Sequence, residues 1–201
     1  GHKIDISSLD FKKIEDEFLK VKENQNIAVQ SLKDKVAKKL NKLLDHNPLR
    51  VDFYERYQEI IEDYNQGKEY RSIKEIFDEL LVLLGDLSEE SKRAERENLE
   101  EEELTVFDML LKDKKISDKE KVQVKEAAKE LLKRLKNKEF KVQHWTEKIQ
   151  TASAVKKVIE DYLFEKLPSP SYDEDIQVKS KILFDDFKER YANYKSSAAM
   201  I

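Results

Sequence analysis

The chain has 201 residues and a net charge of −4; 41% of its residues are charged, 39% are hydrophobic, and it holds three glycines, three prolines and no cysteine. The lack of cysteine excludes disulfides and thiolate metal sites, and so few turn residues exclude a sheet protein of this length. No apolar run approaches the roughly 18 residues of a membrane span, so we expect no membrane partner.

Apolar residues recur at helical spacing through almost the whole chain. In chain order, the predicted helices are marked by apolar sets at 9–21, 27–44, 53–64, 73–87, 104–111, 122–135, 149–163 and 176–191. In the seventh set, one repeating apolar stripe consists of Ile149, Ala152, Val155, Val158 or Ile159, and Tyr162 or Leu163. The pattern predicts an all-α fold, an irregular multi-helix bundle of about eight helices.

Local signals predict where several helices begin and end. Asn47-Pro48 should end the second helix, because the residue before proline disfavours the helical conformation. Thr146 is a candidate N-cap for the seventh helix. Three pairs fit the capping-box pattern at helix starts: Ser72 with Glu75, Ser117 with Glu120, and Ser171 with Glu174.

We expect a single domain over residues 1–201. Within it, residues 1–47 form a leading helical arm, residues 48–195 form the helical bundle, and residues 196–201 are a tail. Gly1 and His2 resemble the remnant of a tag, and the chain lacks an initiator methionine, so we expect a fragment of a longer protein.

Charge is unevenly distributed along the chain. From Glu59 to Leu104 there are 16 acidic and 6 basic residues, a net of −10, whereas from Lys112 to Lys157 there are 15 basic and 7 acidic residues, a net of +8. Such asymmetry is typical either of solvated helix faces or of one face for a basic partner and one for an acidic partner.

The chain carries none of the common catalytic or nucleotide-binding motifs. It has no GxxxxGK[ST] phosphate loop, no GxGxxG fingerprint, no GxSxG elbow and no nucleophilic cysteine. His46 and His144 lie far apart in sequence. We therefore expect no metal site and no cofactor in this chain.

One acidic segment leaves an enzymatic alternative open. DEDIQVK, from Asp173 to Lys179, is similar to the acid-x-Lys arrangement of metal-dependent nucleases. Those sites need the acids and the lysine on adjacent strands around a divalent metal. Here the acids fall in the first turn of a predicted helix, where they complement its dipole. We expect no catalytic activity from this chain.

The stretch from His144 to Tyr172 holds the only tryptophan and two of the prolines. Trp145 is either a core residue at a helix entry, with its N–H satisfied, or an exposed anchor for a protein partner. The candidate partner-interface residues of this stretch are Trp145, Lys148, Lys156, Lys157 and Tyr172.

Several ordered groups of residues carry a family resemblance. They are DFYERYQEIIEDYNQG at 52–67, LEEEELTVFDML at 99–110, VKEAAKELL at 124–132, Trp145 with QTASAVKKVIEDYL at 150–163, and finally Leu167-Pro168, Tyr172, Lys179, Phe184 and Tyr191. In this order and spacing, from about Ile6 to about Tyr194, the chain resembles the C-terminal helical region of the R subunit of type I restriction-modification enzymes. Where that family often has Arg before Ala-Ala-Val, this chain has Ala152-Ser153.

The resemblance implies a role in assembly. The R subunit of such enzymes carries a nuclease and two motor domains that drive ATP-dependent DNA translocation, so ATP and Mg are expected in those other domains. The helical region is expected to dock the R subunit onto the methyltransferase core. The implied partners are the M and S subunits and the rest of the R subunit, in a bacterial or archaeal cytoplasm, for restriction of phage DNA.

Two other functions stay open alongside docking. The basic stretch at 112–157 predicts a domain that contacts duplex DNA nonspecifically during translocation, with an affinity that falls steeply with salt. A plain helical bundle that only braces the motor would show neither binding activity.

Overall fold

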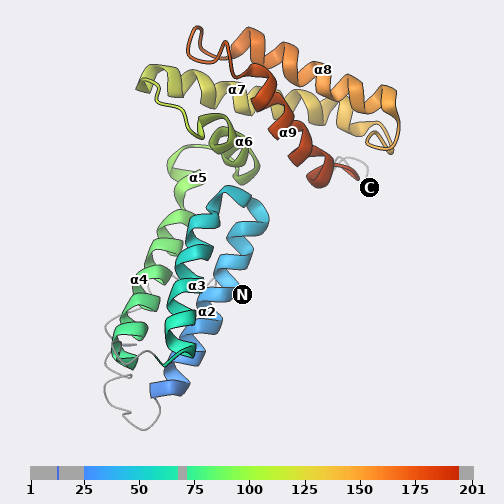
Figure 1. Ribbon diagram of the computed structural model, residues 1–201. Coiled ribbons are helices and arrows are strands. Elements are labelled where there is room, and N and C mark those ends of the chain that lie inside the picture. The colour runs from blue at the N-terminus through green and yellow to red at the C-terminus, as the bar shows by residue number, and fades with distance from the viewer. Residues whose placement is uncertain (1–12, 14–24, 68–71, 195–201) are drawn as a thin grey trace. The chain divides into compact units, whose positions relative to one another are not determined.

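Eight α-helices and two short 3₁₀ turns make up the described part of the chain, which contains no β-strand (Figure 1). The computed structural model describes Lys13, residues 25–67 and residues 72–194. The predicted all-α fold with about eight helices is confirmed. The first predicted helix, at 9–21, and the predicted tail, at 196–201, lie outside the described residues.

The chain divides into two compact units, residues 1–98 and residues 99–201. The division between these units follows Asn98, whereas the sequence predicts one domain with a leading arm that ends at residue 47. The reason is that the second predicted helix, observed as α2 (Gln25–His46), packs against α3 (Val51–Asn65) and α4 (Ile73–Ser91). It belongs to the core of the first unit and is not an arm beside it.

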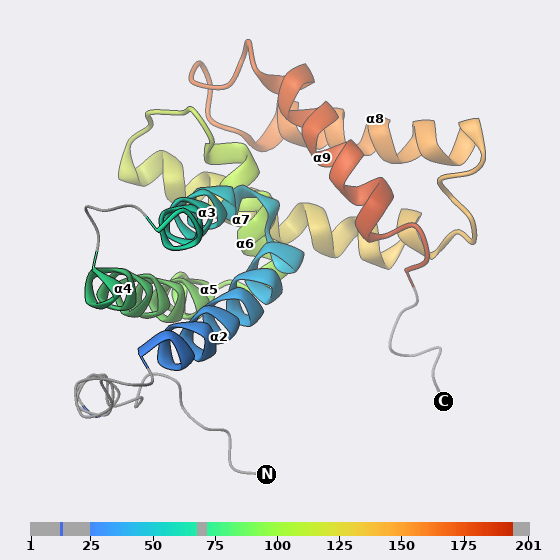
Figure 2. The same ribbon diagram turned by 60° about the horizontal axis from the view of Figure 1, so that its bottom comes forward.

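The first unit is a three-helix arrangement in which α2 and α3 both lie along α4 (Figures 1 and 2). The short helix α5 (Arg93–Arg96) follows α4. The core is aliphatic except for one phenylalanine and is built from residues spaced three or four apart on each helix. Its most buried members are Val29, Leu32, Val36, Leu40, Leu43, Ile76, Phe77, Leu80, Leu83, Leu84 and Leu87.

A charged side chain fastens the junction between α2 and α3. The helix α2 ends at His46 as Asn47-Pro48 predicts, and the turn η3 (Pro48–Arg50) follows. The buried Arg50 donates one hydrogen bond from Nε to Glu90 Oε1 at 3.0 Å and another from Nη1 to the carbonyl oxygen of Leu43 at 3.0 Å. Arg50 thus links the end of α2 to the end of α4, and the Leu43 carbonyl oxygen accepts a second hydrogen bond, at 3.0 Å, from the Asn47 N–H.

Two of the predicted helix starts are confirmed and two are wrong. Complete capping boxes open α4 at Ser72 and α7 at Ser117. By contrast, α8 begins at Ile149 without a side-chain cap, and α9 begins at Ile176. The Ser171 hydroxyl, predicted as a cap, instead donates a hydrogen bond to the carboxylate of Glu120, so a tertiary contact replaces the local one.

The second unit contains four α-helices and one 3₁₀ turn among its described residues (Figure 1). They are α6 (Glu101–Leu111), α7 (Asp118–Asn137), η4 (Glu139–Lys141), α8 (Ile149–Lys166) and α9 (Ile176–Arg190). The helix α8 packs against α7 and α9, and α9 also contacts α6. Residues from turns and loops join this core beside those from helices.

Candidate functional site

Trp145 is a core residue and not an exposed anchor. Its side chain is 0% exposed, and its indole Nε1 donates a hydrogen bond to the carbonyl oxygen of Tyr191 at 2.8 Å. Thr151, in the first turn of α8, donates from Oγ1 to the Trp145 carbonyl oxygen at 2.6 Å. Because the ring and its N–H are both used inside the unit, no part of the side chain is left for a partner.

An aromatic cluster surrounds Trp145. The ring of Phe140 lies between those of Trp145 and Tyr191, with centroid distances of 5.4 and 4.8 Å and nearly parallel planes. Phe187 meets Phe140 edge-on at 5.6 Å. Burial raises the pKa of the Tyr191 phenol. The cluster joins η4, the turn before α8 and the end of α9, and this explains the burial of a tryptophan outside any helix.

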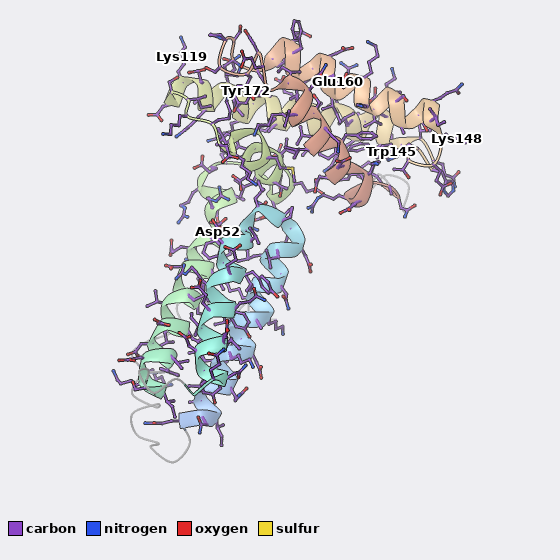
Figure 3. All side chains as sticks on the ribbon, viewed as in Figure 1. Asp52, Lys119, Trp145, Lys148, Glu160 and Tyr172 are labelled. Carbon is purple, nitrogen blue, oxygen red and sulfur yellow. The ribbon has the colours of Figure 1, made fainter. Side chains whose placement is uncertain are left out.

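Tyr172 is also a core residue, near the other end of the second unit (Figure 3). Its hydroxyl donates a hydrogen bond to the carbonyl oxygen of Leu110 at 2.8 Å, and the Lys114 ammonium lies 4.8 Å from its ring centroid. Burial raises the pKa of Tyr172 to about 12. Since the side chain is 0% exposed, Tyr172 tethers the turn after α8 to α6 and is not an interface residue.

The acid-x-Lys segment is engaged in packing. Lys179 is buried and donates from Nζ to the carbonyl oxygens of Met109 at 2.9 Å and Lys112 at 2.8 Å, so it caps the end of α6. Burial lowers the pKa of Lys179, against the opposing charge of Asp175. Asp175 itself forms an ion pair with Lys114.

The three lysine candidates are all exposed at the start or on the surface of α8. Lys148 precedes the first residue of the helix, and Figure 3 shows it beside Trp145. Lys157 forms an ion pair with Asp161 at 3.1 Å, whereas Lys156 is exposed one residue earlier. These three lysines are therefore accessible, unlike the two aromatic candidates.

Two large apolar residues on α8 are exposed, and sequence reasoning missed both. Ile149 is 87% exposed and Phe164 is 80% exposed, although Ile149 was assigned to the buried stripe of this helix. The buried stripe is instead made of Val155, Ile159, Tyr162 and Leu163. Ile149 is the first helical residue, ahead of the point where α8 enters the core.

The exposed apolar residues share a face with the lysines. At 3.6 residues per turn, Ile149 and Phe164 lie about 60° apart around the helix and about 22 Å apart along it. We call this surface the outer α8 face; it consists of Ile149, Ser153, Lys156, Lys157, Glu160 and Phe164. On a helical wheel, Ser153, Lys157 and Phe164 lie opposite the buried stripe, whereas Ile149, Lys156 and Glu160 lie at its edge. A wheel would therefore have identified Phe164 as exposed but not Ile149.

The basic stretch seen in the sequence is partly neutralised by folding. Lys136 of α7 forms an ion pair with Glu102 of α6, and Lys114 and Lys121 have acidic partners in Asp175 and Asp118. A surface groove of about 530 Å³ between α6 and α7 is lined largely by glutamates and lysines of the two helices. The last residues of the acidic stretch at 59–104 therefore neutralise part of the positive charge of the basic stretch at 112–157.

Among the described residues, no three His, Cys, Asp or Glu side chains are grouped so as to hold a metal ion. In the same part of the chain, no helix is long and apolar enough to cross a membrane.

Residues 1–180 match the model of a protein family described as "Type I restriction enzyme HindI endonuclease subunit-like, C-terminal". The chain belongs to this family. The comparison with curated proteins gave no match, and the comparison with solved structures gave none either.

Membership of this type I restriction endonuclease subunit family confirms the resemblance carried by the ordered motifs. The matched residues include the outer α8 face, the Trp145 turn and Tyr172. The motifs that carried the resemblance combine buried residues such as Leu104, Val124 and Trp145 with exposed ones, which include Lys156 and Lys157 of the outer α8 face.

Proposed function

We propose that this chain is a non-catalytic assembly domain that docks a type I restriction endonuclease R subunit onto the M and S subunits of its methyltransferase. The outer α8 face is the proposed contact surface. The motor and nuclease chemistry, with ATP and Mg, belongs in this proposal to other domains of the R subunit. Its setting is the bacterial or archaeal cytoplasm, in restriction of phage DNA.

The observation that carries the proposal is the exposure of Phe164 and Ile149. A phenylalanine that is 80% exposed buries little of the apolar area that makes the residue stabilising in a fold. Large apolar side chains of this kind become anchors when a partner encloses them, and a few such anchors supply most of an interface's free energy. The face therefore suits a partner with an apolar pocket.

The charges on the outer α8 face favour a protein partner over a polyanion. Lys156 and Lys157 share the surface with Glu160, and Lys157 is already paired with Asp161. Mixed charges around apolar anchors are typical of the polar rim of a protein interface. A nucleic-acid backbone would instead meet both attraction and repulsion here.

The proposal that the chain is non-catalytic rests on the positions of the acid-x-Lys residues. Lys179 is bonded to two carbonyl oxygens of α6 and the adjoining loop, and Asp175 is paired with Lys114. Asp173 accepts a hydrogen bond from the Ser169 hydroxyl at 3.0 Å. These groups have structural partners, and Lys179 is not directed at an accessible site.

A titration of the purified chain against its cognate methyltransferase, at low salt, tests the docking proposal. Phe164→Gln and Ile149→Gln should each weaken binding by about tenfold or more, since loss of an anchor costs about 2 kcal/mol. Val122→Gln is the matched control, because Val122 is 59% exposed on α7 but lies off the outer α8 face. Equal losses for all three variants, or no binding by the unaltered chain, would refute the proposal.

Nonspecific contact with duplex DNA through the basic stretch is the alternative. It is less favoured for α7, because part of that charge faces the glutamates of α6. Binding to duplex but not to the methyltransferase, lost on changing α7 lysines, would support it. Binding to neither would leave a helical brace within the R subunit.

A further inference from the structure

The exposed side of α2 carries a row of lysines. Lys35, Lys38 and Lys42 are exposed, and Lys39 lies beside them, partly exposed. They fall on the side of α2 away from its buried residues, such as Val36 and Leu40. We call these four residues the α2 lysine row.

No acidic side chain in the described residues forms an ion pair with the α2 lysine row. Elsewhere in the first unit, basic side chains form ion pairs: Lys74 pairs with Asp78 at 3.3 Å and Arg56 pairs with Asp86 at 2.9 Å. The pKa of Lys39 is lowered by burial and then by the positive charges of Lys42 and Lys92. Lys92, just after α4, thus extends the positive potential beyond α2.

The α2 lysine row does not help the helix to fold. Lys35 lies three residues before Lys38 and four before Lys39, and Lys42 repeats both spacings on the other side. Like charges three or four residues apart on a helix repel one another and destabilise it. Asp34 lies four residues before Lys38 and so shares its face of α2, but the two described side chains form no ion pair, and the charge of Asp34 acts on the phenol of Tyr57 in α3. Like charges left unpaired along one helix face suit a polyanionic ligand outside the unit.

We propose that the α2 lysine row binds the phosphate backbone of duplex DNA. From Lys35 to Lys42 the row is about 10 Å long, which corresponds to about three successive phosphates along one strand. Lysine suits this role as a strongly hydrated point charge that needs no fixed geometry. The contact would be independent of base sequence, since phosphates carry no base identity.

Two competing polyanions fit the row less well. Single-stranded nucleic acid is usually held by aromatic side chains between the cations, and no aromatic residue lies on α2. A membrane surface would need an accessible apolar face beside the lysines, but the apolar face of α2 is buried in the first unit. Duplex DNA requires only the accessible charges.

The test is a fluorescence anisotropy titration of the 201-residue chain with a labelled duplex of about 24 base pairs, between about 50 and 200 mM salt. The logarithm of affinity should fall with the logarithm of salt concentration with a slope of about −3, because about three phosphates are neutralised. The combined variant K35Q, K38Q, K42Q should bind at least tenfold more weakly, with the slope reduced by about one for each lysine removed.

A matched variant separates this row from general positive charge. K119Q, K133Q, K141Q removes three exposed lysines of the second unit and the same net charge, and it should keep nearly the affinity of the unaltered chain. If that variant loses as much affinity as the α2 variant, or if no duplex binding occurs at the lowest salt, the proposal is wrong. Circular dichroism confirms folding, and the pair K38Q, K42Q replaces the triple variant if helicity falls.

Two further arms identify the ligand class. Single-stranded DNA of the same length should bind more weakly than the duplex, and vesicles of phosphatidylserine with phosphatidylcholine should show no binding that depends on the α2 lysines. Tighter binding in either arm would overturn the assignment to duplex DNA. Phe164→Gln should leave duplex binding unchanged, so the docking proposal and this one fail independently.

Discussion

The two units of this chain build their cores in different ways. The first unit packs long amphipathic helices through aliphatic residues, with the guanidinium of Arg50 as its principal buried cation. The second unit relies on residues outside its helices: Trp145 and Tyr172 each donate a hydrogen bond to a distant backbone carbonyl. In the first unit helix faces define the core, whereas in the second unit the loops complete it.

This difference shows which buried residues a sequence pattern does not predict. Periodicity reports which side of a helix is buried, but it is silent for a residue in a turn. A large aromatic residue in a loop can be an exposed interface anchor or a buried core residue. Which of the two it is depends on whether residues distant in sequence enclose it. The following experiments test the contrast, because Trp145 is the only tryptophan and its fluorescence reports on the second unit alone.

Trp145→Ala should have the largest effect, a loss of about 3–5 kcal/mol in the free energy of unfolding of the second unit. The substitution leaves a cavity beside Phe140 and removes one of the two hydrogen bonds to the Tyr191 carbonyl oxygen, which keeps only the longer one from the Tyr194 N–H at 3.3 Å. Urea denaturation followed by circular dichroism measures the loss. Trp145→Phe, which keeps most of the volume, should cost about 1 kcal/mol through the lost hydrogen bond. Equal costs would mean that packing around the ring contributes little.

Arg50→Met should destabilise the first unit by about 2 kcal/mol, because it removes the hydrogen bonds of a buried guanidinium to Glu90 and to the Leu43 carbonyl oxygen. Both acceptors keep a second partner, since Glu90 pairs with Arg93 and the Leu43 carbonyl oxygen accepts from the Asn47 N–H. The denaturation midpoint from tryptophan fluorescence should stay near that of the unaltered chain. Arg56→Met removes an exposed pair with Asp86 and should cost under about 0.5 kcal/mol. A similar loss for both variants would contradict the role assigned to burial.

Alkaline pH should weaken the second unit more than the first. Burial raises the pKa of Tyr172 to about 12 and also raises the pKa values of Tyr162 and Tyr191. Above about pH 10, these phenols stay protonated in the folded state while the same phenols are deprotonated in the unfolded chain. The stability is therefore fully present below about pH 10 and falls as pH rises from about 10 towards 12, by about 2 kcal/mol for Tyr172.

Urea midpoints from tryptophan fluorescence, measured across that pH window, check the alkaline prediction. Tyr172→Phe should flatten the pH dependence while lowering stability at neutral pH, because the bond to the Leu110 carbonyl oxygen is lost. In the first unit, burial raises the pKa of Tyr57, so a smaller alkaline loss is expected there. An unchanged slope in the phenylalanine variant would rule out Tyr172 as the source.

The helix caps should give the smallest effects and similar ones in both units. Ser72→Ala and Ser117→Ala each remove a side-chain acceptor from a capping box and should cost about 1 kcal/mol. The loss should appear in the first unit for Ser72 and in the second for Ser117. Replacing either serine with Gly should cost only a few tenths of a kcal/mol. A much larger effect at Ser117 would indicate that its box also supports the contact between Glu120 and Ser171.

Much of the fold was predictable from local pattern. The order of the helices, the break at Asn47-Pro48 and the capping boxes at Ser72 and Ser117 all follow from residues within four positions of one another. The candidate site was predictable only in part. The exposed lysines of α8 were identified, but Ile149 was assigned to the buried stripe and Phe164 was not singled out. Helical spacing alone does not say where along its length a helix leaves the core.

The sequence by itself determined that this chain is helical, which stripes of its long helices are buried and which family it belongs to, because these depend on short-range periodicity and ordered motifs. Only the tertiary structure decided that Trp145 and Tyr172 lie inside, that Glu102 neutralises Lys136, and that the α2 lysines have no ion-pair partner among the described residues. Those outcomes depend on residues far apart in sequence, whose proximity is set by packing and not by local pattern.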